Sequence, residues 1–236
     1  MRLLRIGYAA PDENLACDEW LLDRCSRGLL PGSGILRLWE SPVPFAVLGL
    51  SNDAARELFL DRCSDDKIPV VRRRSGGGTV LQGPGCLNYS LIIPTSVSKE
   101  LDGITRTNQW VLKNHQQALA PLLTGSRIQI DGLSDLTLDG KKFSGNAQRR
   151  LKNVVLMHGT FLYGFDLAAI ERYLRLPPKQ PEYRKSRPHP EFLINLPLSS
   201  AQIQSAIAAC WNAVEPGIIP PDEEITRLAQ TRANKP

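Results

Sequence analysis

A run of three glycines, flanked by strand-like sequence and preceded by three arginines, constrains this chain more than any other feature. The segment from Val70 to Leu81 reads VVRRRSGGGTVL. Three consecutive glycines favour neither helix nor strand, because glycine loses the most backbone entropy on folding. They predict a turn where the backbone approaches something closely, and unobstructed N–H groups beside guanidinium groups suit a phosphate or carboxylate. A surface turn with solvated arginines is an equally weighted alternative on these residues alone.

The composition indicates a globular protein and narrows the functional classes. The 236 residues, 42% hydrophobic and 22% charged, suffice for one large domain with its own core. The net charge of +5 suits an anionic ligand or an acidic partner. Basic residues neither follow one helix nor alternate with aromatic residues, so no nucleic-acid partner is expected. No apolar run is long enough for a signal peptide or a membrane span, so no membrane partner is expected either.

The cysteines indicate reduced thiols in a cytoplasmic protein. Their number is odd, their spacing is wide and no C-x-x-C pair occurs, and with three histidines they form no metal-ligand spacing. The five are Cys17, Cys25, Cys63, Cys86 and Cys210.

The order of predicted elements favours an α+β fold. Helices are expected at 12–27, with Asp12 or Asn14 as cap, and at 53–62, 105–123, 166–174 and 199–214. Strands are expected near 1–8, 35–40, 45–50, 68–73, 79–81, 87–93, 127–130 and 154–163, with a hairpin at 136–143 around Asp139-Gly140. The proline-rich segment 177–190 predicts a loop or a connector leaving the domain, and 216–236 predicts a polar, frayed tail. Without strict βαβ alternation, we expect mixed, largely antiparallel sheets flanked by helices, not a Rossmann domain.

Three further clusters are candidates for chemistry. Asn88 lies mid-strand among apolar residues, where it either satisfies the sheet or contacts a ligand. Lys141 and Lys142 follow the predicted hairpin turn and point to opposite faces of a strand, so only one can reach a site; a basic surface hairpin is the alternative. His158 is by itself more typical of a satisfied core histidine, although Gly159 indicates close backbone approach.

Together these clusters resemble, in order and spacing, the lipoate–protein ligase family of the biotin/lipoate ligase superfamily. The resemblance spans most of residues 1–196, including an opening helix near residues 12–19. The matching motifs are Arg72-Arg73-x-Ser75-Gly76-Gly77-Gly78-Thr79-Val80, Asn88-Tyr89-Ser90-Leu91, Asp135-Leu136-Thr137, Gly140-Lys141-Lys142-x-Ser144-Gly145-x-Ala147 and His158-Gly159-Thr160.

The resemblance implies a biotin/lipoyl ligase-like catalytic domain that uses ATP, Mg²⁺ and lipoate to form lipoyl-AMP. The lipoyl group then passes to a lysine of a lipoyl domain or a glycine-cleavage H-like protein. Lys142 is the implied catalytic residue, facing inward with Lys141 outward, and Asp135 is a candidate for the Mg²⁺ side. Arg73 would face the phosphate, with Arg72 and Arg74 turned toward an acidic acceptor. The implied substrate and adenylate site is Arg73, Ser75, Gly76, Gly77, Gly78, Thr79, Asn88, Ser144, Gly145, Ala147, His158 and Gly159.

Two departures from the family pattern leave rival functions open. Residues 1–196 form the expected catalytic domain, whereas 197–236 are too few for an accessory domain and are read as a short helical extension; a separate accessory chain is one solution. Related octanoyltransferases use a cysteine, and Gly132-Leu133-Ser134-Asp135 holds none where one type carries it. Cys86 is read mainly as a small buried residue. The rivals are therefore an ATP-independent octanoyl or lipoyl transferase, and a non-catalytic ligand-binding subunit.

Overall fold

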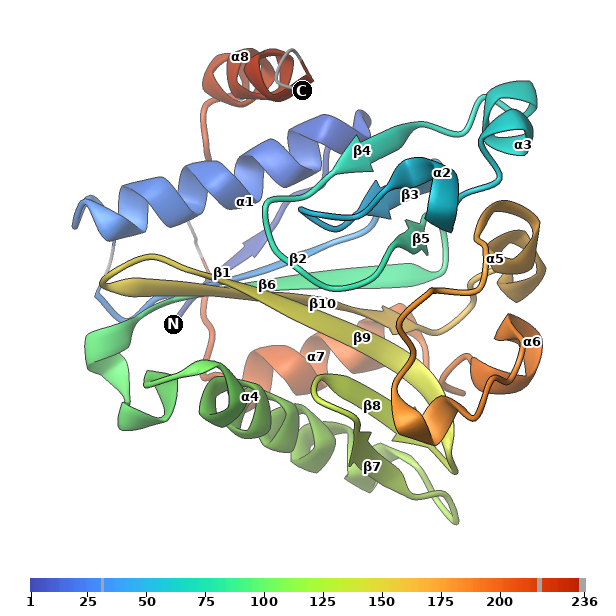
Figure 1. Ribbon diagram of the computed structural model, residues 1–236. Helices are drawn as coiled ribbons and strands as arrows, with labels where there is room; N and C mark the ends of the chain where they lie inside the picture. Colours follow the sequence, from blue (N-terminus) through green and yellow to red (C-terminus); the bar gives the residue numbers. More distant parts are fainter. Residues whose placement is uncertain (31, 216–217, 234–236) are drawn as a thin grey trace.

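The computed structural model describes residues 1–30, 32–215 and 218–233, in two sheets with helices around them (Figure 1). The large sheet comprises β1 (Arg2–Arg5), β2 (Ile35–Trp39), β6 (Cys86–Pro94), β7 (Ile128–Asp131), β8 (Asp135–Leu138), β9 (Lys141–Arg150) and β10 (Val154–Leu162). The small sheet comprises β3 (Phe45–Leu48), β4 (Val70–Arg72) and β5 (Val80–Gln82). Two short helices, α2 (Ala54–Glu57) and α3 (Leu60–Asp65), join β3 to β4.

The strand topology confirms the predicted α+β class. The seven strands run in the order β1-β2-β6-β10-β9-β8-β7, and every pair except β1–β2 is antiparallel. In the small sheet β3 is central, parallel to β4 and antiparallel to β5. Because β4 and β5 flank β3, the glycine turn that joins them must cross the end of β3.

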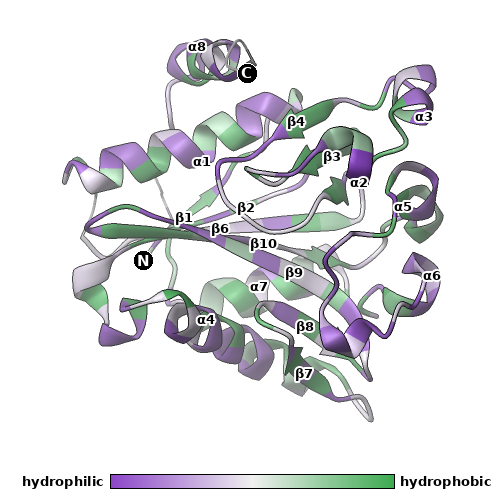
Figure 2. Ribbon diagram, in the orientation of Figure 1, coloured by the Kyte–Doolittle hydropathy of each residue, from purple (hydrophilic) through white to green (hydrophobic). Residues whose placement is uncertain are grey.

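Helices cover both faces of the large sheet, as Figure 1 shows. On one side lie α1 (Pro11–Ser26) and α8 (Asp222–Ala233), which pack on each other with Leu21 and Ile225 in a shared core. On the other side, α4 (Ile104–Leu119) and α7 (Ser200–Cys210) pack with Val111 and Ile207 in the largest core. Hydrophobic and hydrophilic residues alternate along α1 and α4 in Figure 2, as expected of helices with one buried side. Short 3₁₀ helices occur at η1 (Thr95–Val97), η2 (Lys99–Leu101) and η3 (Ala120–Leu122).

Local sequence signals fixed several boundaries. Asp139 and Gly140 both have positive φ, 50° and 79°, so the β8–β9 hairpin turns where the Asp-Gly pair predicted. Ser199 and Gln202 form a capping box at the start of α7. The cap proposed for α1 was wrong, because the helix begins at Pro11 after Ala10, and Asn14 instead bonds the backbone of Tyr8.

The tail is more ordered than its composition predicted. Residues 222–233, expected to be frayed, form α8, because Glu224 accepts hydrogen bonds from Trp20 and Arg24 on α1. Near its end, Arg232 pairs with Glu19 and donates to the Arg72 carbonyl oxygen, 2.7 Å away. Residues 216–217 and 234–236 of the predicted tail lie outside the described residues.

The proline-rich connector does not leave the domain. After α5 (Leu167–Tyr173) it folds into η4 (Glu182–Arg184) and α6 (His189–Phe192), and then returns to the large sheet. There the N–H of Ile194 donates to the carbonyl oxygen of Lys142 at 3.0 Å. The connector, residues 177–193, is therefore attached beside the lysine hairpin. Within the described ranges, none of the helices has the length and apolarity to cross a membrane.

Candidate active site

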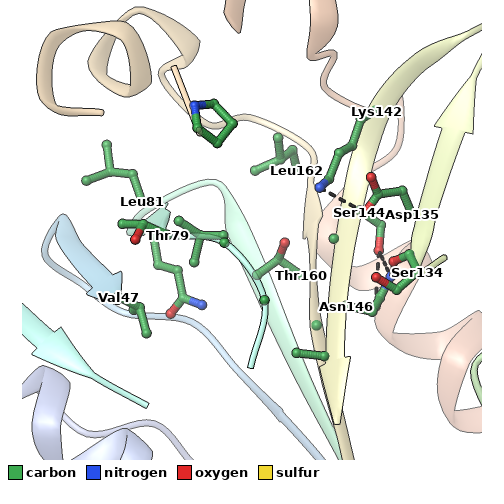
Figure 3. A pocket seen from close by; sticks show the side chains of 18 of the residues that line it. Val47, Thr79, Leu81, Ser134, Asp135, Lys142, Ser144, Asn146, Thr160 and Leu162 are labelled. Atoms are coloured by element: carbon green, nitrogen blue, oxygen red, sulfur yellow. Dashed lines mark hydrogen bonds and ion pairs between the residues drawn. The ribbon is translucent and has the colours of Figure 1, made fainter. Parts of the chain in front are cut away.

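A cavity of about 730 Å³ lies between the two sheets and under the connector. This volume is within the usual range of small-molecule sites. In Figure 3, Val47, Thr79 and Leu81 of the small-sheet side stand across the cavity from Lys142 and Asp135. The small-sheet side thus contributes apolar side chains among polar ones, and the opposite wall carries an ammonium group. This arrangement suits a ligand with an apolar chain and an anionic head.

Lys142 brings a cationic head into this cavity. Its Nζ lies 2.9 Å from Asp135 Oδ1, and its side chain is 25% exposed. The lysine lies across Gly145, where a Cβ would come within 2.8 Å of its Nζ and Cε. Lys141, its neighbour on β9, is exposed and does not line the cavity. The predicted inward and outward faces are confirmed.

The other oxygen of Asp135 is held from the connector. Tyr183, on η4, donates its hydroxyl to Asp135 Oδ2 at 2.7 Å. Burial is the main cause that raises the pKa of Tyr183, and the Asp135 charge adds to it, so this hydroxyl stays protonated. Tyr183, Asp135 and Lys142 thus form a continuous chain from the connector to the cavity.

The guanidinium of Arg73, which was expected to face a phosphate, is engaged within the glycine turn. Its Nη2 donates to the carbonyl oxygens of Gly76 and Gly78 at 2.8 and 2.7 Å, and its Nε donates to Ser75 Oγ at 3.1 Å. Burial lowers its pKa to about 10. Carbonyl oxygens of the turn are the nearest acceptors for a buried cation, so the arginine shapes the turn instead of reaching past it.

The other two arginines of the motif also serve the fold. Arg72 donates to three backbone carbonyl oxygens, those of Gly49, Leu50 and Asn52. Arg74 pairs with Glu19 on α1 at 3.1 Å. Both point away from the cavity, as predicted, but their partners lie within this chain.

The exit of the glycine turn is fixed by a buried carboxylate. Glu57 at the end of α2 accepts hydrogen bonds from the Thr79 N–H at 3.0 Å and from Asn52 Nδ2 at 2.8 Å. Asn52 Nδ2 also donates to the Gly77 carbonyl oxygen. The two ends of the turn are therefore held by Arg73 and Glu57.

A buried polar network links the turn to the large sheet. The Nε2 of His158 lies 2.6 Å from Ser75 Oγ, while its Nδ1 lies 4.0 Å from Asp18 Oδ2. Asp18 pairs with the fully buried Arg37 at 2.7 Å and accepts from Ser90 Oγ. Burial lowers the pKa of His158 to about 4, so the imidazole is neutral near pH 7.

The cavity gathers most of the predicted site residues. Ser75 and Gly76 are the exceptions: they do not line it, and Ser75 faces a small hollow behind the turn. Gly159 lines the cavity, but the group that approaches its backbone is the Asn146 side chain, which a Cβ there would overlap. The predicted residues on the cavity wall are Arg73, Gly77, Gly78, Thr79, Asn88, Asp135, Lys142, Ser144, Gly145, Ala147, His158 and Gly159.

Sequence reasoning missed the connector's contribution. Tyr183 reaches Asp135, while Arg184 and His189 line the cavity directly. Burial lowers the pKa of His189 to about 4, and the nearby positive charges of Arg184 and Lys142 lower it further. The only available signal was a tyrosine, two arginines and a histidine within seven residues, Tyr183 to His189, inside a segment read as a loop.

The chain is similar in sequence to a named ligase and to a named transferase. The chain is 31% identical over 166 residues to a probable lipoate-protein ligase A of Mycoplasma pneumoniae, covering 70% of this chain and 46% of that protein. The chain thus spans about half the length of that ligase. It is also 25% identical to an octanoyltransferase LipM of Kyrpidia tusciae, over 95% of this chain and 92% of that enzyme.

Two solved structures share the fold at a TM-score of 0.77 and 22% identity. One is a bi-partite lipoate protein ligase from Thermoplasma acidophilum, from a study with its E2 lipoyl domain; the match covers 98% of this chain and 90% of that one. The other is a lipoate-protein ligase A bound with ATP, with 98% and 92% covered.

The family assignment rests on most of the chain. Residues 10–210 match the model of the lipoyl protein ligase A/B catalytic domain. That range contains the glycine turn, the lysine hairpin, the His158 strand and the connector. The chain belongs to the lipoyl protein ligase A/B catalytic domain family.

Proposed function

We propose that this chain acts as a lipoate–protein ligase. It activates lipoate with ATP to lipoyl-AMP, releasing pyrophosphate, and transfers the lipoyl group to a lysine of an acceptor protein. The observation that carries the proposal is Lys142, whose ammonium lies in a cavity of ligand size across from the apolar side chains of Val47 and Leu81. A fixed cation there would stabilise negative charge that develops on the carboxylate and α-phosphate oxygens.

The cysteines argue for this reaction over a thiol-dependent transferase. Cys17, Cys25, Cys63 and Cys86 are buried, and across the described ranges no cysteine lines the cavity. Burial raises the pKa of Cys86, the cysteine nearest a motif, to about 12. Because the thiolate is the nucleophile in acyl-enzyme formation, such a thiol is poorly suited to the role.

Different residues on the cavity walls would bind different parts of the lipoyl-adenylate. The apolar side, with Val47 and Leu81, would hold the acyl chain, and the backbone of Gly77 and Gly78 would lie along the adenylate. Asn88, Ala147 and His158 complete the pocket. The connector would exclude water over the reacting groups.

Mg²⁺ is the metal ion that an ATP-dependent reaction implies, but these residues do not fit a protein-built site. The described part of the chain has no group of three or more His, Cys, Asp or Glu side chains that could hold a metal ion. Asp135, the predicted Mg²⁺-side residue, has both oxygens engaged, by Lys142 and Tyr183. We therefore assign Mg²⁺ to the phosphates of the nucleotide and route no step through it.

The acceptor is proposed to be a lipoyl domain or a glycine-cleavage H-like protein. The archaeal structure reported together with an E2 lipoyl domain supports this class. That ligase is bi-partite, which supports a separate accessory chain as a partner here. A cytoplasmic location belongs to the proposal, supported by five free cysteines.

Mass spectrometry of an acceptor domain tests the proposal directly. The domain is incubated with this protein, ATP, Mg²⁺ and either lipoate or octanoate, and pyrophosphate is measured in parallel. A second arm supplies synthetic lipoyl-AMP without ATP, which isolates transfer from activation. A lipoylated lysine in the ATP arm supports the ligase, product in the lipoyl-AMP arm alone supports transfer without activation, and no modification in both arms contradicts the proposal.

The octanoyltransferase is the second candidate, favoured by the similarity to LipM over 95% of this chain. It predicts acyl transfer from octanoyl-acyl carrier protein without ATP, lost on Cys86→Ser. Binding of lipoate with no product in any arm would instead indicate a ligand-binding subunit.

The two hairpin lysines provide a matched pair of variants. We expect Lys142→Ala to lower adenylation by roughly a hundredfold or more, because it removes a preorganised charge from the site. Lys141→Ala should change the rate less than about twofold, because that side chain is exposed outside the cavity. Pyrophosphate release measures both, and equal losses would contradict the assignment of faces.

A further inference from the structure

The connector carries an arginine for which the described part of the chain provides no ion-pair partner. Arg184 is 5% exposed and lines the cavity. In the described parts of the chain it forms no ion pair, and its Nη2 is buried without a hydrogen-bond partner. A buried, unpaired guanidinium is costly, so such a group normally has a partner.

The surroundings explain why no side chain supplies that partner. Asp135 is the carboxylate whose charge acts most directly on Arg184, but Lys142 and Tyr183 occupy its two oxygens. Arg184 Nε donates to the Arg187 carbonyl oxygen at 3.0 Å, which fixes the base of the guanidinium group. Its face lies on the Phe192 ring, with Cζ 4.4 Å from the centroid. The group is thus oriented by its neighbours and not neutralised by them.

Arg184 and Lys142 reach the same part of the cavity. Both line it, and the positive charges of both act on His189, the first residue of α6. Arg73 is the arginine that the sequence motif predicted to face the phosphate. Its guanidinium donates hydrogen bonds to carbonyl oxygens of the glycine turn. The cavity therefore holds two cationic groups from different elements, one on β9 and one on η4.

We propose that Arg184 is a substrate-binding residue that holds a carboxylate or phosphate oxygen of the substrate together with Lys142. This inference rests on the proposed function, because it assumes an anionic substrate in this cavity. A guanidinium offers a planar fork to an oxyanion, whereas Lys142 supplies a point charge. The connector thus recognises the substrate as well as covering it.

Calorimetric titration with two ligand pairs tests the inference. AMP and adenosine differ by the phosphate, and lipoate and lipoamide differ by the carboxylate charge. Wild-type protein should bind the anionic member of at least one pair more tightly, and Arg184→Gln should reduce that preference by roughly tenfold to a hundredfold. The pair that responds identifies the anion. Unchanged preferences in both pairs, or no preference in the wild type, would overturn the inference.

Further variants separate binding from the folding of the connector. Arg187→Gln is the matched control, because Arg187 Nη2 donates to the Tyr183 and Gly140 carbonyl oxygens and the residue does not line the cavity. It should leave both preferences unchanged; the same loss as in Arg184→Gln would overturn the inference. Arg184→Lys should retain part of the preference. If Arg184→Gln does not fold, Arg184→Met, whose chain can still pack on Phe192, replaces it.

Different results would contradict the proposed function and the role of Arg184. A wild-type protein that modifies no acceptor contradicts the ligase, while its preferences for AMP and lipoate remain measurable. A wild-type protein that is active, with unchanged preferences in Arg184→Gln, contradicts only the role of Arg184.

Discussion

The glycine turn (residues 73–79) and the connector (residues 177–193) both bring arginine to the cavity, and they use it in opposite ways. Arg73 donates to the carbonyl oxygens of its own turn. Arg184 lies on an aromatic ring with a buried Nη2 that the described part of the chain leaves without an acceptor. The first arginine stabilises a wall of the cavity. The second keeps a hydrogen-bond donor for which the described part of the chain supplies no acceptor.

This difference shows that closeness in sequence does not decide which charge is available to a ligand. Glycines expose carbonyl oxygens as well as N–H groups, so a cation next to them meets acceptors at once. In the connector, the nearby carboxylate is already engaged by Lys142 and Tyr183. Accounting for each donor and acceptor therefore separates a structural arginine from a binding one.

The comparison predicts that a change at Arg73 affects mainly stability. Arg73→Gln removes charged hydrogen bonds to two carbonyl oxygens and to Ser75, which should lower the free energy of unfolding by about 4 kcal/mol. Chemical denaturation followed by circular dichroism measures the loss. Arg73→Lys should recover only part of it, because an ammonium cannot span both acceptors.

Arg184→Gln is the control from the other region. Because the substitution removes an unpaired buried charge, the free energy of unfolding of the variant should equal or exceed that of the wild type. If Arg73→Gln kept full stability but lost the preference for AMP over adenosine, Arg73 would be a substrate-binding residue and not a structural one.

The stability of the folded protein should depend on pH through His158, which links the glycine turn to the large sheet. The pKa of His158 is about 4 in the folded protein and about 6.5 in an unfolded chain, so between these values the unfolded state binds more protons. Stability from this group is therefore complete above about pH 6.5 and declines as the pH falls toward 4. The shift corresponds to about 3 kcal/mol.

Comparison with a variant isolates this histidine from the others. His115 and His189 also have lowered pKa values, about 3 and 4, so the wild type should lose more stability than one group explains. His158→Gln should have a shallower dependence on pH between 6.5 and 4, measured by urea unfolding at several pH values. Parallel curves for the two proteins would show that His158 takes up no proton on unfolding.

The lysine hairpin was predictable because its signals are local. The Asp139-Gly140 turn sets the register of the strands that follow it, and strand alternation then places Lys142 inside and Lys141 outside. The α+β class was predictable for the same reason, since short strands joined by turn residues leave few other arrangements.

The position of the connector was not predictable in this way. Nothing local in residues 177–193 specifies that Tyr183 meets Asp135, which is 48 residues earlier in the chain. Likewise α8 is marginal as an isolated amphipathic segment and is fixed by Trp20 and Arg24 on α1. Contacts between residues far apart in the sequence fix the connector and α8, and local sequence patterns do not specify such contacts.

The smallest expected effect concerns how the connector positions Lys142 through Asp135. Tyr183→Phe removes one hydrogen bond of 2.7 Å and keeps the ring against Phe192. A hydrogen bond of about 1 kcal/mol predicts a roughly fivefold lower kcat with an unchanged KM for ATP, because binding contacts remain while the lysine is held less firmly. If the residues act as one chain, Tyr183→Phe should add less loss in an Asp135→Asn background than in the wild type. Full additivity would mean that Tyr183 only packs the connector, and the coupling between connector and hairpin would then rest on other contacts, such as the Ile194–Lys142 and Arg187–Gly140 hydrogen bonds.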